Sequence, residues 1–398
     1  MIKVEMLSTG DEVLHGQIVD TNAAWLADYL FSQGLPLTRR NTVGDNLDDL
    51  VAILQERSRQ ADVLIVNGGL GPTSDDLSAL AAATAKGEEL ILHQEWLAQM
   101  ERFFAERGRV MAPSNRKQAE IPASAGIVDN PVGTACGFVL QLNRCLMFFT
   151  PGVPSEFKAM VDQQIMPRLR ERLALPEPPL CLRLTTFGRS ESDLAHCLSH
   201  LQLPEGVVMG YRSSMPIIEL KLTGPASQRQ QMEALWQEVR AVAGQSTVFE
   251  GTIGLPGWLA QQLRVRDAKL VTSEQFTAGL LALQLSRADA PLVTGEVLAT
   301  VSETLEETLR RGQSLARAKA CEFALAAGGM VEEHLNLALV TPQGGYGVRL
   351  KMASNRHSLV IRQEVCAMMA LNMLRRWLNG WDVAAEHGWI DVVETLEL

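Results

Sequence analysis

The chain has 398 residues, which is longer than one ordinary domain, so we expect two or three packed units with their own cores. Hydrophobic residues make up 46% of it, but no apolar run approaches the ~20 residues that span a bilayer, which argues against a membrane protein. The formal net charge of −10 argues against nucleic-acid binding, because phosphate-backbone affinity comes from clustered Lys and Arg. A small anionic ligand is still compatible with this charge, because backbone amides can hold it.

Cysteine usage and the first residues predict a cytoplasmic protein. The six cysteines are scattered without any C-x-x-C spacing, which fits neither a zinc site nor a disulfide framework. The opening MIKVEML carries Lys3 and Glu5 in an alternating, strand-like pattern that is unlike a signal peptide.

Strand-like and helix-like segments alternate through the first 170 residues. The predicted elements are strands at 2–7, 35–43 and 61–66, helices at 20–34, at 45–60 and from about residue 75, and a hairpin over 136–150. This order predicts an α/β fold, in which a mostly parallel sheet is covered by helices on both faces. In such sheets, ligands bind beyond the carboxyl ends of the strands.

Three prolines within the segment 173–180 predict a linker, and the predicted domains are 1–172, 180–250 and 251–398. The second domain has the pattern of a small α+β unit with three strands and two helices. The third has an α/β pattern, with two helices expected between Ser302 and Ala327 and a long helix from Ser358 to Leu378.

The stretch NGGLGPTSDD, residues 67–76, follows a buried strand and precedes a helix. Its glycines let the backbone approach a ligand closely, and its free amides, with the positive end of the helix, favour an anion such as phosphate. Alone, the loop is equally typical of an ordinary connection in which Asp75 or Asp76 caps the helix.

Carboxylates after three neighbouring strands change this balance. Asp11 and Glu12 follow the first strand, Asp45 follows the second, and Asp75 and Asp76 follow the third, so all five are expected at one edge of the sheet. Any single one is more typical of a helix cap, but five together favour a site for a divalent metal cation and a phosphate group.

The segment SNRKQAEIP, residues 114–122, is expected to return to the same edge. There Lys117 would offset the charge of a substrate phosphate, while Asn115 and Gln118 would fix its orientation. The alternative is an exposed basic face without a ligand.

The chain resembles a known family through the motifs STGDEVLHGQIVDTNAAWLADYL, VGDNLDDL, NGGLGPTSDDLS, NRKQAEIP, NPVGTACGF and FTPGVPSEF. In order and spacing they are similar to the amino-terminal domain of the CinA (competence and damage-inducible) family. Its fold is shared with the MoaB/MogA molybdopterin-binding proteins and related domains of gephyrin. The resemblance implies a cytoplasmic homo-oligomer, here expected to be a homodimer, with divalent-metal-dependent ADP-ribose pyrophosphatase activity.

The resemblance also implies roles for individual residues. Phosphate would be held by Gly68, Gly69, Gly71 and Thr73, and Asp75 and Asp76 would bind metal or position water. The pocket would be completed by Asp11, Asp45, Asn115, Lys117 and Gly133, with Asp11 as a further metal ligand and Lys117 as a catalytic group. Serine at 78 and cysteine at 136 depart from the family's usual threonine and proline.

The middle domain resembles the KH-like domain of the same family through FGRSESDL, residues 187–194. A GXXG loop that would clamp a nucleic-acid backbone is not evident, so we expect a structural spacer. His196 and His200 have metal-ligand spacing on a helix, but without a third ligand they are more typical of a solvated face.

The third domain resembles the family's carboxy-terminal domain, which in active members is a nicotinamide mononucleotide (NMN) deamidase. Active members carry E-S-C-T-G-G where this chain has EQFTAG, so serine, cysteine and one glycine are replaced by Gln275, Phe276 and Ala278. A Y-S-N motif and its lysine are replaced by residues 299–301 and Thr304. Because the nucleophile and the group that takes its proton are both lost, we expect a deamidase-like fold without the activity.

The leading hypothesis is therefore a metal-dependent hydrolase that cleaves the diphosphate bond of ADP-ribose or a related nucleotide in the first domain. One alternative is a non-catalytic module that binds a nucleotide or a pterin phosphate. The other is an interaction protein or dimeric scaffold whose sites have all decayed. In the third domain, Phe276 is expected to fill part of the former deamidase pocket.

Overall fold

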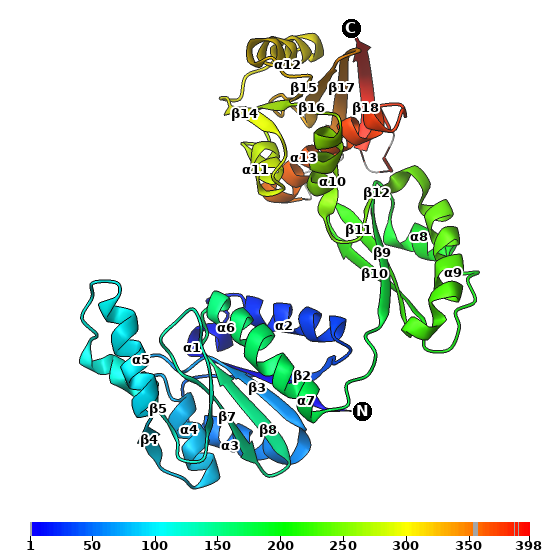
Figure 1. The fold of residues 1–398 in the computed structure, drawn as a ribbon. Helices are drawn as coiled ribbons and strands as arrows, with labels where there is room; N and C mark the ends of the chain where they lie inside the picture. The colour runs from blue at the N-terminus through cyan, green and yellow to red at the C-terminus, as the bar shows by residue number, and fades with distance from the viewer. Residues whose placement is uncertain (1, 353–356, 386, 389) are drawn as a thin grey trace. The chain divides into compact units, whose positions relative to one another are not determined.

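The computed structural model describes residues 2–352, 357–385, 387–388 and 390–398, and the chain divides into two compact units, Met1–Pro179 and Leu180–Leu398 (Figure 1). Both units combine helices with strands, which confirms the predicted α/β class. None of the helices in the described part of the chain has the length and the hydrophobicity that a membrane span requires.

The first unit is built on a six-stranded sheet with the order β2-β1-β3-β8-β7-β6. Its strands are β1 (Val4–Thr9), β2 (Leu37–Val43), β3 (Val63–Asn67), β6 (Gly126–Val128), β7 (Gly137–Leu142) and β8 (Cys145–Thr150). Strands β2, β1, β3 and β8 run parallel, and Ser8 of β1 pairs with both Thr42 of β2 and Asn67 of β3. The carboxyl ends of these four strands therefore meet at one edge of the sheet.

Helices cover both faces of this sheet, so the unit has three layers (Figure 1). They are α2 (Thr21–Ser32), α3 (Leu47–Gln60), α4 (Ser78–Lys86), α6 (Pro154–Met160) and α7 (Met166–Arg172), whereas the short helix α1 (Asp11–Leu14) after β1 has no buried residue. In β3, Leu64 and Val66 pack in the core that includes α3 and α4, whereas Val63 and Ile65 pack in the core that includes α2 and α6. Both faces of the strand are buried, which explains its continuous apolar run.

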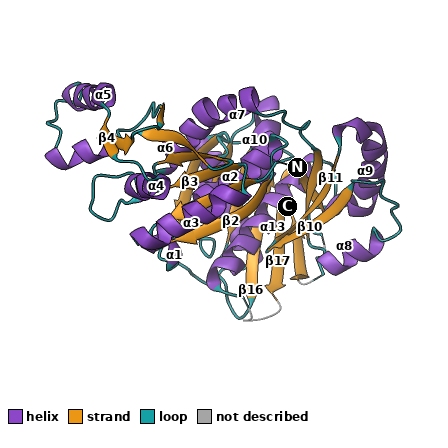
Figure 2. Ribbon diagram, turned by 90° about the horizontal axis from the view of Figure 1, so that it is seen from below, coloured by secondary structure: helices purple, strands orange, loops and turns teal. Residues whose placement is uncertain are grey.

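A small lobe extends from this unit (Figure 2). It contains β4 (Leu90–Leu92), α5 (Gln94–Ala105), the 3-10 helix η1 (Pro113–Ala119) and β5 (Glu120–Pro122), and β4 pairs antiparallel with β5. Because Trp96 and Met100 of α5 are buried in the same core as α3 and α4, the lobe is anchored to the sheet. Helix η1 then returns the chain to the edge where the parallel strands end.

The second unit contains two sheets. A four-stranded antiparallel sheet has the order β10-β11-β9-β12 and a six-stranded sheet has the order β14-β13-β15-β16-β17-β18. Their strands are β9 (Leu180–Phe187), β10 (Val208–Ser214), β11 (Ile217–Gly224), β12 (Thr247–Glu250), β13 (Leu270–Glu274), β14 (Leu292–Val297), β15 (Phe323–Ala327), β16 (His334–Thr341), β17 (Gly344–Met352) and β18 (Ile390–Glu397).

The helices of this unit are α8 (Glu191–Cys197), α9 (Arg229–Ala243), α10 (Gly254–Val265), α11 (Leu280–Arg287), α12 (Leu305–Lys319) and α13 (Leu359–Leu378). The expected pair of helices between Ser302 and Ala327 is wrong, because only α12 forms there and residues 323–327 are strand β15. This strand lies between β13 and β16 and is completely buried, so its short apolar run FALAA fills the middle of the sheet.

Helix α13 joins the two sheets of the second unit. Arg375, which is buried, donates from its guanidinium group to the backbone oxygens of Thr247 (2.6 Å) and Gln245 (2.8 Å), at the start of β12. Phe187 and Val248 of the four-stranded sheet also belong to the core of the six-stranded sheet. The expected division at residue 250 thus falls inside one compact unit, and it stays a prediction.

Candidate functional site

A cavity of about 540 Å³ lies where the parallel strands of the first unit end. It is lined by residues at the end of each of these strands or directly after it: Ser8–Gly10 at the end of β1, Asp45 after β2, residues 67–73 at the end of β3 and residues 151–154 after β8. This is the place where α/β sheets bind ligands, and a volume of this size is typical of a small-molecule site.

Two buried asparagines fix the floor of the cavity. Asn67 donates from Nδ2 to the backbone oxygen of Pro151 (2.7 Å), which ties the loop after β3 to the loop after β8. Asn22, in the first turn of α2, donates to Asn67 Oδ1 (3.0 Å) and to the backbone oxygen of Gly152 (2.8 Å). Neither asparagine was predicted from the sequence to have a role, although Asn67 opens the quoted glycine loop.

The glycine loop forms as predicted between β3 and α4, although α4 begins at Ser78 rather than near Asp75. Gly68 and Gly69 both have positive φ, 110° and 69°, which only glycine adopts easily. The amide of Gly68 donates to the backbone oxygen of Thr150 (2.9 Å), so Gly68 shapes the turn instead of offering its own N–H. The Ser78 hydroxyl donates to the backbone oxygen of Gly68 (2.8 Å), so serine does have a function at this position.

Asp76 organises the second half of the loop. Its carboxylate accepts hydrogen bonds from both the backbone N–H (2.9 Å) and the hydroxyl of Thr73. Lys117 of η1 donates to the backbone oxygen of Thr73. A hydrogen bond from Thr73 lowers the pKa of Asp75, and the charge of Lys117 adds to this effect.

Six carboxylates line the cavity, and none of its lining residues in the described chain is Lys, Arg or His. They are Glu12, Asp20, Asp45, Asp75, Asp76 and Glu156. Lys117 lines only a small cleft that adjoins the cavity at Gly71 and Asp76. Burial raises the pKa of Asp45, and the charges of Asp11, Glu12 and Asp75 raise it further. The site is therefore strongly electronegative.

Asp11 is held differently from the other predicted metal ligands. Asp11 Oδ1 accepts from the backbone N–H of Asp45 (3.1 Å), and Asp45 Oδ2 accepts from the backbone N–H of Asp11 (3.0 Å), which ties together the loops after β1 and β2. Asp11 is not among the lining residues of the cavity. Within the described ranges, no three His, Cys, Asp or Glu side chains form a group that could hold a metal ion. The set of Asp11, Asp75 and Asp76 stays a prediction.

Helix η1 brings Lys117 and Gln118 to the site, as expected. Gln118 lines the cavity, and its Oε1 accepts from Asn115 Nδ2 (2.9 Å) and from the Thr134 hydroxyl (3.2 Å). Asn115 lies outside the lining residues, so in this structure its contact is with Gln118.

Glu156 is a site residue that the sequence analysis missed. It lies in the first turn of α6, and its carboxylate accepts from Asn130 Nδ2 (2.7 Å). Asn130 Oδ1 in turn accepts from the backbone N–H of Gly133 (3.0 Å). A Cβ atom at Gly133 would lie 2.2 Å from the Glu156 carboxyl carbon, so glycine at this position makes room for the carboxylate. The quoted motif FTPGVPSEF contains Glu156 and was the available signal.

Gly71 has the same relation to Asp76, since a Cβ atom there would lie 2.5 Å from Asp76 Oδ2. Gly71 and Gly133, which were predicted to line a phosphate pocket, therefore also make room for the carboxylates of Asp76 and Glu156.

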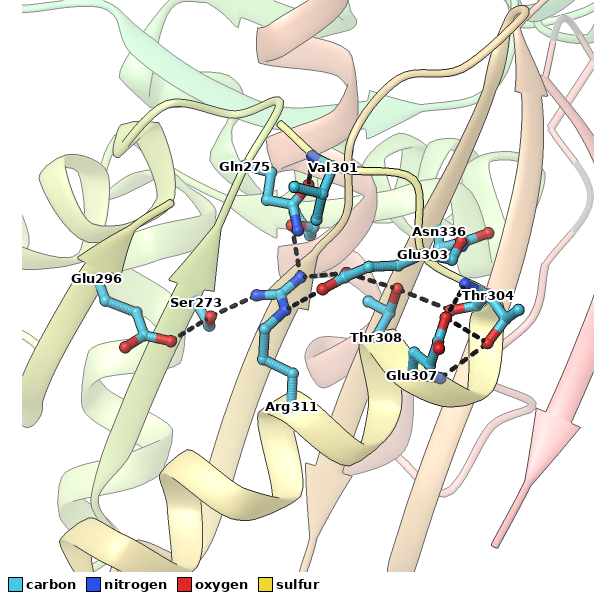
Figure 3. Close-up of polar contacts among 11 residues, drawn as sticks. Ser273, Gln275, Glu296, Val301, Glu303, Thr304, Glu307, Thr308, Arg311 and Asn336 are labelled. Carbon is cyan, nitrogen blue, oxygen red and sulfur yellow. Dashed lines mark hydrogen bonds and ion pairs between the residues drawn. The ribbon is translucent and has the colours of Figure 1, made fainter. Parts of the chain in front are cut away.

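In the second unit, two side chains of the loop EQFTAG, residues 274–279, accept hydrogen bonds from nearby backbone groups. The carboxylate of Glu274 accepts from the backbone N–H groups of Gly279 (3.1 Å), Leu281 (3.0 Å) and Ala282 (2.8 Å), so it caps α11. Gln275 Oε1 accepts from the backbone N–H of Val301 (3.0 Å) (Figure 3). Phe276 packs against the core of the six-stranded sheet.

The neighbouring charged groups pair with each other as well. Arg311 forms two hydrogen bonds of 3.0 Å with Glu303 and donates to the Ser273 hydroxyl, which itself donates to Glu296 (Figure 3). Thr304 caps α12 in a capping box with Glu307. Thr304 stands where active relatives carry lysine, so this position now has a structural role.

Comparisons with known proteins agree with this architecture. Residues 5–171 match the sequence model of the family described as a probable molybdopterin binding domain. Over the full length of both chains, the protein is 71% identical to a CinA-like protein and to an "NMN amidohydrolase-like protein YfaY", both of Escherichia coli K12 strains. The chain therefore belongs to the family of CinA-like proteins, and the resemblance drawn from the motifs is confirmed.

Among solved structures, the CinA protein of Thermoplasma acidophilum is 29% identical and covers 43% of this chain and 96% of its own, with a TM-score of 0.38. A competence or damage-inducible protein from Enterobacter asburiae is 14% identical and covers 32% of this chain and 99% of its own, with a TM-score of 0.29.

The contact between Gly133 and Glu156 can be tested without an activity assay. Gly133→Ala should lower the free energy of unfolding by about 1 kcal/mol, because Glu156 must move and give up its hydrogen bond to Asn130. In a Glu156→Ala background, the same substitution should cost less than about half as much. Urea unfolding of the four chains measures this coupling, and Gly126→Ala, where a Cβ atom meets only Val139 at 3.5 Å, is the matched control. Equal costs in both backgrounds would contradict the assigned contact.

Proposed function

We propose that the first unit hydrolyses the diphosphate bond of ADP-ribose or a related nucleotide, with a divalent cation bound beside the phosphates. The observation that carries this proposal is a cavity with six carboxylates and, among the lining residues that the structure describes, no basic side chain. Such a surface repels a diphosphate, and a bound cation would neutralise this repulsion. The glycine loop that ends β3 supplies the close backbone approach that a phosphate group requires.

The residues present fit a hard divalent cation. All the acidic donors are oxygen atoms, and Mg²⁺ is commonly held by one or two carboxylates together with substrate phosphates, so a preformed group of three is not required. Asp75 and Asp76 would hold the cation, with Asp11 as the further predicted ligand. When bound, the cation would polarise a phosphoryl oxygen and favour deprotonation of water.

The chain's own residues would position the substrate. The backbone from Gly69 to Gly71 would face the diphosphate, and Lys117 would reach it from the adjoining cleft. Gln118, held by Asn115 and Thr134, would donate its side-chain N–H groups to a phosphate or sugar oxygen.

A second candidate function is a binding module that holds a nucleotide or a pterin phosphate without cleaving it. The hydrogen bonds from Thr73 to Asp76 favour it, because they give this carboxylate a structural role in the loop. The match to a molybdopterin-binding family model supports it as well. Tight, cation-independent ligand binding without turnover would select this function.

Substitution of Asp76 tests the hydrolase directly. Asp76→Asn keeps an oxygen that can accept from Thr73 but removes the charge, so kcat for release of AMP from ADP-ribose should fall at least ~100-fold with the melting temperature nearly unchanged. Asp48→Asn, at an exposed position in the first turn of α3, is the control, and its kcat should stay within about twofold of that of the native chain. Undiminished turnover by Asp76→Asn would remove this carboxylate from the mechanism.

We also propose that the second unit has no NMN deamidase activity. Supporting this, Glu274 and Thr304 are engaged in helix capping, and Gln275 and Phe276 stand where active relatives carry serine and cysteine. The purified chain should release no nicotinic acid mononucleotide from NMN above a heat-treated control, as followed by chromatography. Enzyme-dependent deamidation would show that another group of this unit serves as nucleophile.

The homodimer expected from the family resemblance is likewise proposed, with sedimentation velocity of the full chain as its measurement.

A further inference from the structure

Three large aliphatic side chains stand exposed at the mouth of the acidic cavity. Val19 is 83% exposed, Ile18 52% and Val153 50%, and all three are among the residues that line the cavity. Single exposed aliphatic residues are common on protein surfaces and need no explanation. These three are different because they gather around one polar cavity, where each leaves apolar surface in contact with water.

The rim formed by Ile18, Val19 and Val153 is held in place by hydrogen bonds of its neighbours. The backbone N–H of Ile18 donates to the backbone oxygen of Glu12 (3.2 Å). Asp20, the residue after Val19, caps α2 by accepting from the backbone N–H of Ala23 (2.8 Å), and it also accepts from the Ser8 hydroxyl (2.6 Å). The rim is therefore a preformed part of the site.

The two segments of the rim are joined to each other. Asn22 donates to the backbone oxygen of Gly152 (2.8 Å), the residue before Val153, so the segment 18–22 and the segment 151–154 lie side by side. Asn22 also donates to Asn67, which precedes the glycine loop. The apolar rim is thus connected through a single asparagine to the place proposed for the phosphates.

We infer that this rim binds the flat heteroaromatic ring of the substrate, while the glycine loop after β3, which lines the same cavity, takes its phosphates. The inference rests on the proposed function, in that it assumes a phosphate-bearing ligand in this cavity. A volume of about 540 Å³ suits a ligand with a ring and a sugar in addition to its phosphates. A flat ring placed over branched aliphatic side chains removes apolar surface of both partners from water, which favours binding.

The aliphatic side chains of the rim also determine which ligand rings can bind there. Ile18, Val19 and Val153 carry no side-chain donor or acceptor that could distinguish one ring edge from another. The ring is therefore selected by its shape and its apolar faces, so purine and pterin rings should both be accepted. Inorganic diphosphate and ring-free sugar phosphates should bind more weakly because they leave the rim exposed to water.

The test compares two ligands that differ by the ring. Binding of AMP and of ribose 5-phosphate to the full chain is measured by calorimetry in the presence of Mg²⁺. The native chain should bind AMP at least tenfold more tightly than ribose 5-phosphate. The double variant Val19→Ser, Val153→Ser should lose most of this preference, with ribose 5-phosphate affected less than twofold. Val110→Ser, at a 96% exposed position outside the cavity lining, is the matched control and should keep the native preference.

Equal affinity of the native chain for the two ligands would overturn the inference, as would a double variant that weakens both equally. A change of oligomeric state in the double variant, with the AMP preference intact, would overturn it too and assign the rim to contacts between copies. The failure of the proposed function is seen separately: a ring preference without release of AMP from ADP-ribose would support the inference and contradict the hydrolase.

Discussion

The first unit holds six carboxylates around one cavity against their mutual repulsion, and the architecture of the site depends on this constraint. Parallel strands β1, β2, β3 and β8 bring the acidic loops to one edge, and nearby N–H groups then anchor individual side chains. Asp76 accepts from Thr73, Asp20 from Ala23, and Glu156 from Asn130. The repulsion is still visible at Asp45, whose pKa is raised by burial first and then by neighbouring charges. Such a site gains stability when a cation binds.

The second unit shows the opposite arrangement. Around the loop EQFTAG, Arg311 pairs with Glu303, and Glu274 is satisfied by three backbone N–H groups. Charges that neutralise one another in this way leave little capacity for binding a charged ligand. This difference in charge balance, together with the replaced motif residues, is the physical reason for proposing a hydrolytic activity in the first unit and none in the second.

Sequence patterns predicted the parallel part of the first sheet and the edge where its loops meet, because strand periodicity and the parallel-sheet rule are local signals. They did not predict that Gly133 makes room for Glu156 or that Asn22 joins two loops, because these contacts link residues that are distant in the chain. The helix expected before Ala327 was wrong for a related reason. A short apolar run fits a helix or a buried strand equally well, and its neighbours β13 and β16 decide between them.

The proposed function requires that the acidic cavity bind a phosphate group only together with a divalent cation. The most direct measurement is the affinity of the full chain for AMP by calorimetry, first in EDTA and then with increasing Mg²⁺ or Mn²⁺. We expect a saturating cation concentration to strengthen AMP binding at least ~100-fold, because the cation replaces repulsion with attraction at the phosphate group. The same affinity in EDTA as in excess cation would contradict it, because the six carboxylates would then not control what the cavity binds.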